Sequence, residues 1–166
     1  KLLPLKANFV NCDISDKKKI NFLLRNKEFD AVMHFAAFTR VGESVQDPKK
    51  YYKNNYDNAK VFFNECLKNG LNKFIFSSTG AVYGNVKHNN KITESENPKP
   101  LNAYSDSKYQ LEKYLIELSD QKKIRSIILR YFNVAGADEK KRSGLTTNPD
   151  NLIKAVCETA MGKRNL

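Results

Sequence analysis

The chain has 166 residues, enough for one domain with a moderate hydrophobic core. Its 29 lysine and arginine residues outnumber the 18 aspartate and glutamate residues, but they are spread over predicted helix faces and loops without an arginine-rich or aromatic-interleaved stripe, which argues against a specific nucleic-acid partner. No apolar run approaches the ~20 residues of a membrane span, so the sequence also argues against an integral membrane protein.

The cysteines and the first residue bear on the cellular setting. Cys12, Cys66 and Cys157 are odd in number, far apart and without metal-ligand spacing, which predicts reduced thiols and a cytoplasmic location. No signal peptide is visible, and the sequence begins at Lys1 rather than at a methionine. We therefore expect an upstream segment to be missing.

Short strands and helices alternate from the start of the chain. Residues 8–11 are predicted to form a strand, and residues 17–26 a helix with an apolar stripe. Residues 31–35 form the next predicted strand. This strand contains His34, which we interpret as a packed core residue rather than a base or a ligand.

The next predicted helix is long. Asp47 is a plausible cap with Pro48 at the first helical position, and Gly70 marks the end of the helix. The same rules predict the remaining elements in turn: a strand at 74–76, a helix capped by Asn102, a strand at 126–131 and a helix at 151–161.

This alternation of strands and helices predicts a parallel sheet covered by helices on both faces. Ligands of such sheets bind at the carboxyl ends of the strands. The candidate residues at these ends are Asp13, Ala36, Ala37, Ser77, Ser78, Thr79, Phe132 and Asn133. Their convergence on one edge predicts a binding site there.

Tyr104 and Lys108 are four residues apart on a predicted helix, so they share a face. A neighbouring ammonium favours the phenolate form of a tyrosine, which makes it a usable proton acceptor, and the hydroxyl of Thr79 is placed to hold a substrate alcohol. The Tyr-x-x-x-Lys spacing occurs four times in the sequence, but only the copy at Tyr104 stands at a helix start beyond a hydroxyl-bearing strand end. We therefore select this copy as the candidate catalytic pair.

Several short motifs follow one another with few gaps over nearly the whole chain. They are His34-Phe35-Ala36-Ala37, Val41-Gly42-Glu43-Ser44-Val45, Phe74-Ile75-Phe76-Ser77-Ser78-Thr79, Ala81-Val82-Tyr83-Gly84, Tyr104 with Lys108, and Arg130-Tyr131-Phe132-Asn133. Together they resemble the extended short-chain dehydrogenase/reductases. Within that family the second and last motifs are most similar to the nucleotide-sugar 4-epimerases.

The resemblance implies an isomerase of galactose metabolism that uses NAD to invert C4 of a UDP-hexose, interconverting UDP-glucose and UDP-galactose. Tyr104 would take the proton of the 4-hydroxyl while the hydride from C4 passes to NAD. Lys108 would assist the tyrosine and bond the nicotinamide ribose, and Thr79 would bind the 4-hydroxyl. The 4-keto sugar would then turn over and take the hydride back on its other face.

The resemblance also implies a set of binding positions. Asp13 and Ile14 would lie near adenine, and the other cofactor positions would be Phe35, Ala36, Ala37, Phe38, Thr39, Asn54 and Phe132. The UDP-sugar positions, besides Thr79 and Tyr104, would be Asn133, Asn151 and Leu152. A full-length protein of this kind is expected to form a homodimer.

The glycine pattern departs from the family. None of the seven glycines forms the Gly-rich loop that holds a dinucleotide pyrophosphate. The expected fold class is therefore α/β, a partial Rossmann-like doubly wound parallel sheet that lacks the first strand-helix-strand and the C-terminal substrate domain. Residues 1–136 would be a partial NAD-binding domain and residues 137–166 the start of the substrate-binding region, and the chain alone would bind NAD poorly.

Other functions stay open at this point. A decarboxylase or another epimerase acting on nucleotide sugars fits the same residues. A dehydratase is disfavoured because Gly80 and Ala81 stand where those enzymes carry an acidic pair. A third possibility is a nucleotide-binding or interaction protein that has lost catalysis, but such a protein has no need of Thr79, Tyr104 and Lys108 together.

Overall fold

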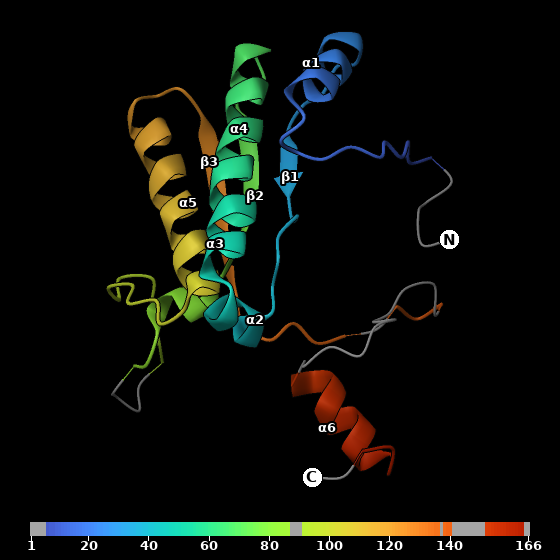
Figure 1. Cartoon of the computed structure of the whole chain (residues 1–166), viewed down its shortest axis with the longest axis vertical. Coiled ribbons are helices and arrows are strands. Elements are labelled where there is room, and N and C mark those ends of the chain that lie inside the picture. Colours follow the sequence, from blue (N-terminus) through green and yellow to red (C-terminus); the bar gives the residue numbers. More distant parts are fainter. Residues whose placement is uncertain (1–5, 87–90, 137, 141–151, 165–166) are drawn as a thin grey trace. The chain divides into compact units, whose positions relative to one another are not determined.

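The computed structural model describes residues 6–86, 91–136, 138–140 and 152–164. The chain divides into two compact units, a larger one of Cys12–Tyr131 and a smaller one made up of Lys1–Asn11 and Phe132–Leu166. The elements of the larger unit are α1 (Lys17–Asn26), β1 (Val32–His34), α2 (Val41–Gln46), α3 (Pro48–Tyr51), the π-helical segment η1 (Tyr52–Asn58), α4 (Ala59–Lys68), β2 (Lys73–Thr79), the 3-10 helix η2 (Gly80–Tyr83), α5 (Ala103–Asp120) and β3 (Arg125–Tyr131) (Figure 1).

The smaller unit contains α6 (Leu152–Ala160), which matches the predicted last helix over its described part. The strand predicted at residues 8–11 is wrong, because these residues form no strand and the Phe9 side chain is 72% exposed. A strand needs a neighbouring backbone to pair with. Among the described residues, none pairs with this segment.

The three strands form a parallel sheet in the order β1-β2-β3, which confirms the predicted α/β class. Ile75 at the centre of β2 pairs with Met33 on one side and with Ile127 on the other. The described elements contain no additional strand between β1 and β2. The pairing therefore agrees with the register in which these are consecutive strands of one half of a doubly wound sheet.

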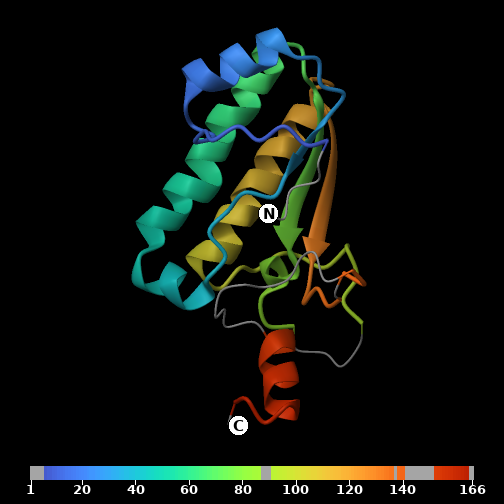
Figure 2. The ribbon, with the colours of Figure 1, turned by 90° about the vertical axis from the view of Figure 1, so that its right-hand side faces the viewer.

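Helices α4 and α5 lie side by side on the same face of this sheet (Figures 1 and 2). The expected cover on both faces is therefore not found within the larger unit. The reason is topological: the strand order advances in one direction, and crossovers of the same right hand place every connecting helix on the same face. The other face carries exposed apolar side chains, with Met33 61% and Ile127 57% exposed.

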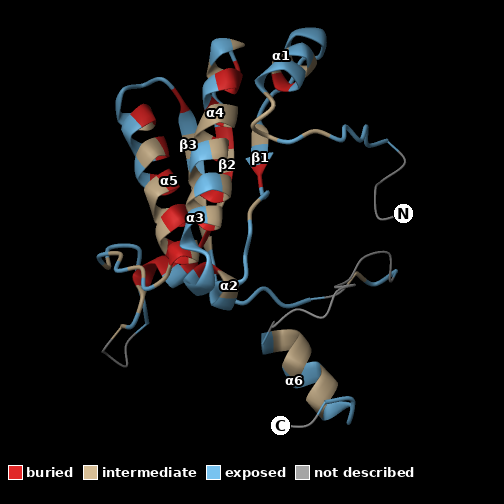
Figure 3. Cartoon of the chain, viewed as in Figure 1, coloured by how far each residue is buried: buried red, intermediate tan, exposed pale blue. Residues whose placement is uncertain are grey.

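The hydrophobic core lies between that pair of helices and the sheet, where their buried faces meet (Figure 3). Its largest members are each no more than 2% exposed: Phe63, Phe74, Phe76, Leu111 and Leu115. Burying a side chain of this size stabilises the folded state by about 1.5–3 kcal/mol. No helix among the residues described is both long enough and apolar enough to cross a membrane.

Local sequence signals explain where several helices begin. Asp16 caps α1 by accepting a hydrogen bond from the Lys19 N–H at 3.1 Å, and α1 has the predicted bounds. Asn102 and Ser105 form a capping box at the start of α5, as the sequence predicts for Asn102. The helix predicted after Asp47 is present, although it passes through a π-helical segment between α3 and α4.

Candidate active site

The carboxyl end of β2 supplies the first predicted catalytic residue. Thr79 is the last residue of the strand and the cap of η2, where its Oγ1 accepts a hydrogen bond from the Ala81 N–H at 3.2 Å. The residue is 7% exposed. The hydroxyl is therefore held at the strand end by the turn that follows it, and its own proton is left to donate.

Helix α5 brings a buried cation to the same strand. Lys108 is 3% exposed, and its Nζ donates a hydrogen bond to the Ser77 carbonyl at 2.8 Å and lies 5.0 Å from the centroid of the Phe76 ring. Burial lowers the pKa of Lys108 from 10.5 to about 8. Tyr104 precedes it by one helical turn and is partly buried. The candidate base and its cation therefore lie on the face of α5 that meets β2.

The other Tyr-x-x-x-Lys copies have different surroundings. Lys60 donates to the Tyr56 hydroxyl at 3.2 Å on the helical layer, and the exposed Lys113 lies 5.0 Å from the centroid of the Tyr109 ring. For the fourth copy, Tyr83 lies in η2, and its partner Lys87 falls outside the described residues. Within the described parts of the chain, only the Lys108 ammonium is buried against the end of a strand.

The loop after β1 is held by an asparagine that the sequence did not single out. The Phe38 N–H donates to Oδ1 of Asn55 at 2.9 Å, and Nδ2 of Asn55 donates to the Phe38 carbonyl at 3.0 Å. Asn55 is 1% exposed, whereas the predicted Asn54 is only partly buried and donates to Asn55 at 2.9 Å. The missed signal is a four-residue spacing, because Tyr51, Asn55 and Ala59 form one buried stripe.

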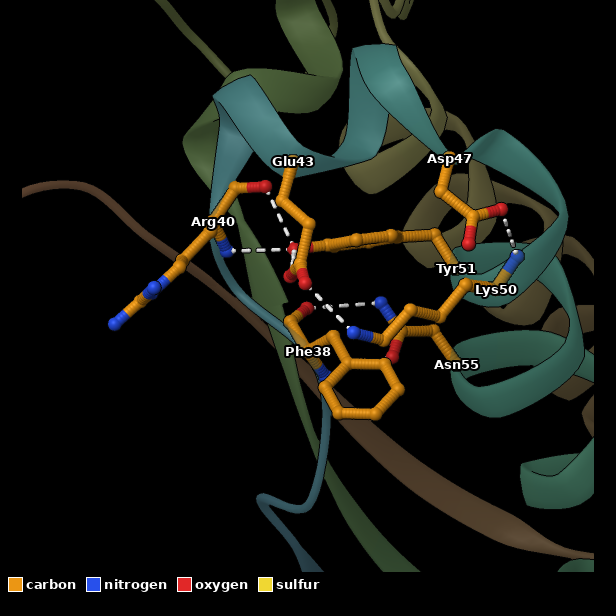
Figure 4. A network of polar contacts seen from close by, with 7 residues as sticks. All are labelled: Phe38, Arg40, Glu43, Asp47, Lys50, Tyr51 and Asn55. Atoms are coloured by element: carbon orange, nitrogen blue, oxygen red, sulfur yellow. Dashed lines mark hydrogen bonds and ion pairs between the residues drawn. The ribbon is translucent and has the colours of Figure 1, made fainter.

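A second set of contacts fixes the same loop at the start of α2 (Figure 4). The hydroxyl of Tyr51 lies 2.7 Å from the Arg40 carbonyl and 2.8 Å from a Glu43 carboxylate oxygen, and it accepts the Arg40 N–H at 3.1 Å. Lys50 donates to the other oxygen of Glu43 at 2.6 Å. Burial and the Glu43 carboxylate raise the pKa of Tyr51 to about 12, so this phenol stays protonated and serves as a structural donor.

The loop that these contacts fix contains five of the predicted cofactor positions. The side chains of Phe35, Ala36, Phe38 and Thr39 are exposed at the carboxyl end of β1, and Ala37 is partly buried. The two alanines add little bulk over their backbone. A flat ligand can therefore approach the backbone of this loop closely.

The predicted adenine residues lie at the start of the larger unit. Asp13 is exposed, and its Oδ1 accepts hydrogen bonds from the hydroxyl and the N–H of Ser15 at 2.6 and 2.7 Å. These bonds lower the pKa of Asp13 below its usual value. Ile14 is partly buried and packs against the hydrophobic core. The Asp13 carboxylate is thus ionised and oriented at neutral pH.

The remaining predicted residues belong to the smaller unit. Phe132 and Leu152 are 63% and 58% exposed, and Asn133 is also exposed. Asn151 lies outside the described residues. The structure thus joins Thr79 and Lys108 through the end of β2, whereas Phe132, Asn133 and Leu152 form part of a separate unit.

The arrangement in the larger unit suits proton transfer from an alcohol. A phenol, an ammonium and a strand-end hydroxyl lie along adjoining parts of α5 and β2, and only one of the three Lys108 N–H groups is used by Ser77. No group of three or more histidine, cysteine or acidic residues suited to a metal occurs among the residues that the structure describes.

Comparisons with known proteins identify the family of the chain. The profile of the NAD dependent epimerase/dehydratase family matches residues 1–163. A UDP-glucose 4-epimerase of Azospirillum brasilense is 40% identical over 163 residues, which is 98% of this chain and 47% of the relative.

Solved structures extend this likeness to the fold. A UDP-Glc/GlcNAc 4-epimerase of Campylobacter jejuni matches 95% of this chain and 48% of its own, with 40% identity and a TM-score of 0.78. A Bifidobacterium longum UDP-glucose 4-epimerase in complex with NAD+ and UDP matches 93% of this chain and 47% of its own, with 33% identity and a TM-score of 0.84. The chain therefore spans about half the length of these relatives.

Proposed function

Because the chain belongs to the NAD dependent epimerase/dehydratase family, we propose that it carries the catalytic base of an isomerase that inverts C4 of a UDP-hexose, interconverting UDP-glucose and UDP-galactose. The observation that supports this most directly is the buried Lys108, which lies one helical turn after Tyr104 and binds the Ser77 carbonyl, two residues before Thr79 on β2.

In this proposal Tyr104, Thr79 and Lys108 have distinct roles. Tyr104 removes the proton of the sugar 4-hydroxyl, and the Thr79 hydroxyl holds that oxygen in place. Lys108 places a positive charge where negative charge develops on the phenol, in surroundings that exclude water and so strengthen the interaction. Since the Ser77 carbonyl uses one Lys108 N–H, two more remain to bind the ribose of a cofactor.

The proposed cofactor is NAD, which supplies a reversible hydride acceptor when bound. Asp13 and Ile14 would hold its adenine side, the backbone of residues 35–39 would follow the dinucleotide, and Asn54 and Phe132 would complete the site. The loop at residues 35–39 is exposed, contains two alanines and is held by the two hydrogen bonds between Asn55 and Phe38. Its backbone is therefore accessible to such a ligand. The pyrophosphate contact would have to come from elsewhere, because the seven glycines form no Gly-rich phosphate loop.

The proposed substrate is a UDP-sugar, with Asn133, Asn151 and Leu152 as its further contacts. The names of the relatives support this class, since they include enzymes for UDP-glucose and for UDP-N-acetylglucosamine. We assign residues 1–136 to part of an NAD-binding domain and residues 137–166 to the start of the substrate-binding region.

The cellular setting belongs to the same proposal. The activity would serve galactose metabolism in the cytoplasm, as expected for a chain with three unpaired cysteines. Within the full-length protein we propose a homodimer. Its support is the family resemblance, which implies a homodimer for full-length proteins of this kind.

The proposal is tested in a chimera in which this chain replaces the matched segment of the Azospirillum epimerase. The chimera should interconvert UDP-galactose and UDP-glucose, and Tyr104→Phe should lower kcat by about 100-fold or more while the purified protein keeps its bound NAD, because only the proton acceptor is lost. The rate is measured by a coupled assay of UDP-glucose.

The matched control is Tyr109→Phe, which alters another Tyr-x-x-x-Lys copy on the same helix. It should leave kcat within about twofold of the parent chimera. An inactive chimera that is folded and loaded with NAD, or a Tyr104→Phe variant with full activity, would overturn the proposed function.

A further inference from the structure

Helix α5 presents a third residue in line with the candidate pair. Tyr104, Lys108 and Glu112 follow one another at intervals of four residues, so they form one stripe along the helix. Glu112 is 0% exposed. The proposed function gives this carboxylate no role, and the sequence motifs did not select it.

The stripe meets β2 at successive residues. Lys108 binds the Ser77 carbonyl at 2.8 Å, and the Glu112 carboxylate accepts a hydrogen bond from the Ser78 hydroxyl. The next residue along the strand is Thr79. These two contacts therefore fix the position of α5 along the end of β2. They lie immediately before Thr79, whose hydroxyl is the candidate substrate-binding group.

An arginine from β3 extends this contact to the turn after Thr79. Nε of Arg130 lies 3.1 Å from both oxygens of Glu112, and its Nη2 lies 2.6 Å from one of them. Its Nη1 donates to the hydroxyl of Tyr83 at 2.8 Å. The hydrogen bonds with Glu112 raise the pKa of the Arg130 guanidinium, so it stays charged at neutral pH.

The pair therefore holds the Thr79 turn on both sides, through Ser78 before it and Tyr83 after it. We propose that Glu112 and Arg130 are positioning residues for the catalytic site, which fix the Thr79 hydroxyl against the Tyr104–Lys108 face of α5. The inference rests on the proposed function for its catalytic meaning. The packing that Glu112 and Arg130 provide involves only β2, η2, β3 and α5.

The test reads the position of Lys108 directly in the 166-residue chain. Each lysine is labelled with trace acetic anhydride from about pH 7 to 11, and mass spectrometry gives the midpoint at which each amine becomes reactive. The parent chain should show Lys108 near 8. With a pKa of about 4, His34 stays neutral throughout this range, and the other titratable groups near Lys108 are Tyr104 and Glu112, one turn to either side of it on α5.

In Glu112→Gln, Lys108 should lose burial as the strand end moves away from α5. Its midpoint should then rise toward the ordinary 10.5, and a rise of one pH unit makes the amine about tenfold less reactive below its midpoint. A purely electrostatic effect has the opposite sign, because removing a negative charge disfavours a nearby ammonium. An unchanged or lower midpoint would overturn the proposal.

Two milder variants keep the proposal testable if Glu112→Gln does not fold. Tyr83→Phe keeps both charges and removes the hydroxyl that accepts the Arg130 hydrogen bond on η2, and Ser78→Ala removes the hydroxyl that donates to Glu112 on β2. Lys60 of α4, which lies over the rings of Tyr56 and of Tyr114 on α5, reports in the same spectra whether the two helices remain packed. If Glu112→Gln unfolds, a Lys108 midpoint that rises in both milder variants supports the proposal, and any other result rejects it.

The control is a carboxylate of similar burial away from the site. Glu65 is 3% exposed and accepts hydrogen bonds from Asn21 and Lys68 between α1 and α4, and Glu65→Gln should leave the Lys108 midpoint unchanged. In the chimera, Tyr83→Phe should lower kcat about tenfold and leave KM unchanged. An inactive parent chimera would count against the proposed function, while the labelling would still decide the positioning role.

Discussion

His34 and Lys108 show how single residues are placed beside the site. His34 is 4% exposed and contacts the rings of Phe62, Phe63 and Phe76, which confirms the interpretation as a packed core residue. Burial and the positive charge of Lys108 lower the pKa of His34 to about 4. At neutral pH the ring is therefore uncharged, and the ammonium of Lys108 has no cationic neighbour there.

This shift predicts how stability depends on pH. The folded chain keeps His34 neutral, whereas the unfolded chain binds a proton with the ordinary pKa of 6.5, so the free energy of unfolding should fall as the pH drops from 6.5 to about 4. The contribution of His34 to this fall is about 3 kcal/mol. His34→Leu should flatten the pH profile of urea unfolding by that amount. An unaltered slope in the variant would contradict the low pKa.

Gly84, which ends η2, should tolerate no side chain. Its φ is +65°, and an added Cβ would lie 2.1 Å from the Lys99 carbonyl oxygen, which belongs to the backbone and cannot turn away. Gly84→Ala should lower the free energy of unfolding by about 2–4 kcal/mol. The matched control is Gly42→Ala, where a Cβ meets nothing within 4 Å. Equal effects of the two substitutions in thermal unfolding would refute the clash.

At the scale of elements, α2 depends on a residue outside it. Arg40 provides no side-chain cap for α2, and the Tyr51 hydroxyl instead binds both the Arg40 backbone and Glu43. Tyr51→Phe leaves these groups without their partner, so the free energy of unfolding should fall by about 1–2 kcal/mol. Hydrogen exchange of the Arg40 amide should become at least about tenfold faster because its hydrogen bond is lost.

The control for this substitution is Tyr114→Phe. The Tyr114 hydroxyl donates to Asn64 in an exposed position, so its loss should cost no more than about 0.5 kcal/mol. If Tyr51→Phe were equally mild and left the Arg40 amide protected, the network in Figure 4 would not be what holds the loop.

The same dependence explains which elements could be predicted from the sequence. Helices α1 and α5 were placed correctly because their caps, Asp16 and Asn102, lie next to the helices that they start. Helix α2 was missed because its stabilising partner, Tyr51, lies eight residues beyond Glu43. The strand at 8–11 was wrong because local apolar character carries no information about a pairing partner.

The residues of the candidate site also differ in whether local sequence could identify them. The Tyr104 copy stays a prediction, selected for its place beyond a strand end, and the structure adds the buried contact of Lys108 with Ser77. Asn55 and Glu112 escaped selection because a polar residue inside a helix has no local mark of burial. Their importance arises from contacts with Phe38 and Arg130, which come from elements distant in the chain.

At the scale of the whole molecule, one face of the sheet carries no helix within the larger unit. Doubly wound sheets carry helices on both faces, and the relatives are about twice as long as this chain. The exposed face presents Met33 and Ile127 at paired positions beside Ile75. These side chains are apolar although, within the larger unit, no helix covers them.

We therefore predict that replacing Ile127 with a charged residue destabilises the fold only in a longer protein. In the 166-residue chain Ile127→Lys should change the free energy of unfolding by less than about 1 kcal/mol, because the side chain is 57% exposed. The neighbouring Ile128 points to the opposite face and packs against the core, so Ile128→Lys should cost about 3 kcal/mol or more. Urea unfolding of the two variants measures the difference.

In the chimera with the Azospirillum epimerase, Ile127→Lys should become as damaging as Ile128→Lys, since a second helical layer would then bury the charge. Light scattering at rising concentration distinguishes one further case. If Ile127→Lys already destabilises the 166-residue chain and breaks an oligomer, copies of the chain cover this face themselves. That result would contradict the prediction and identify self-association as the cover of the bare sheet.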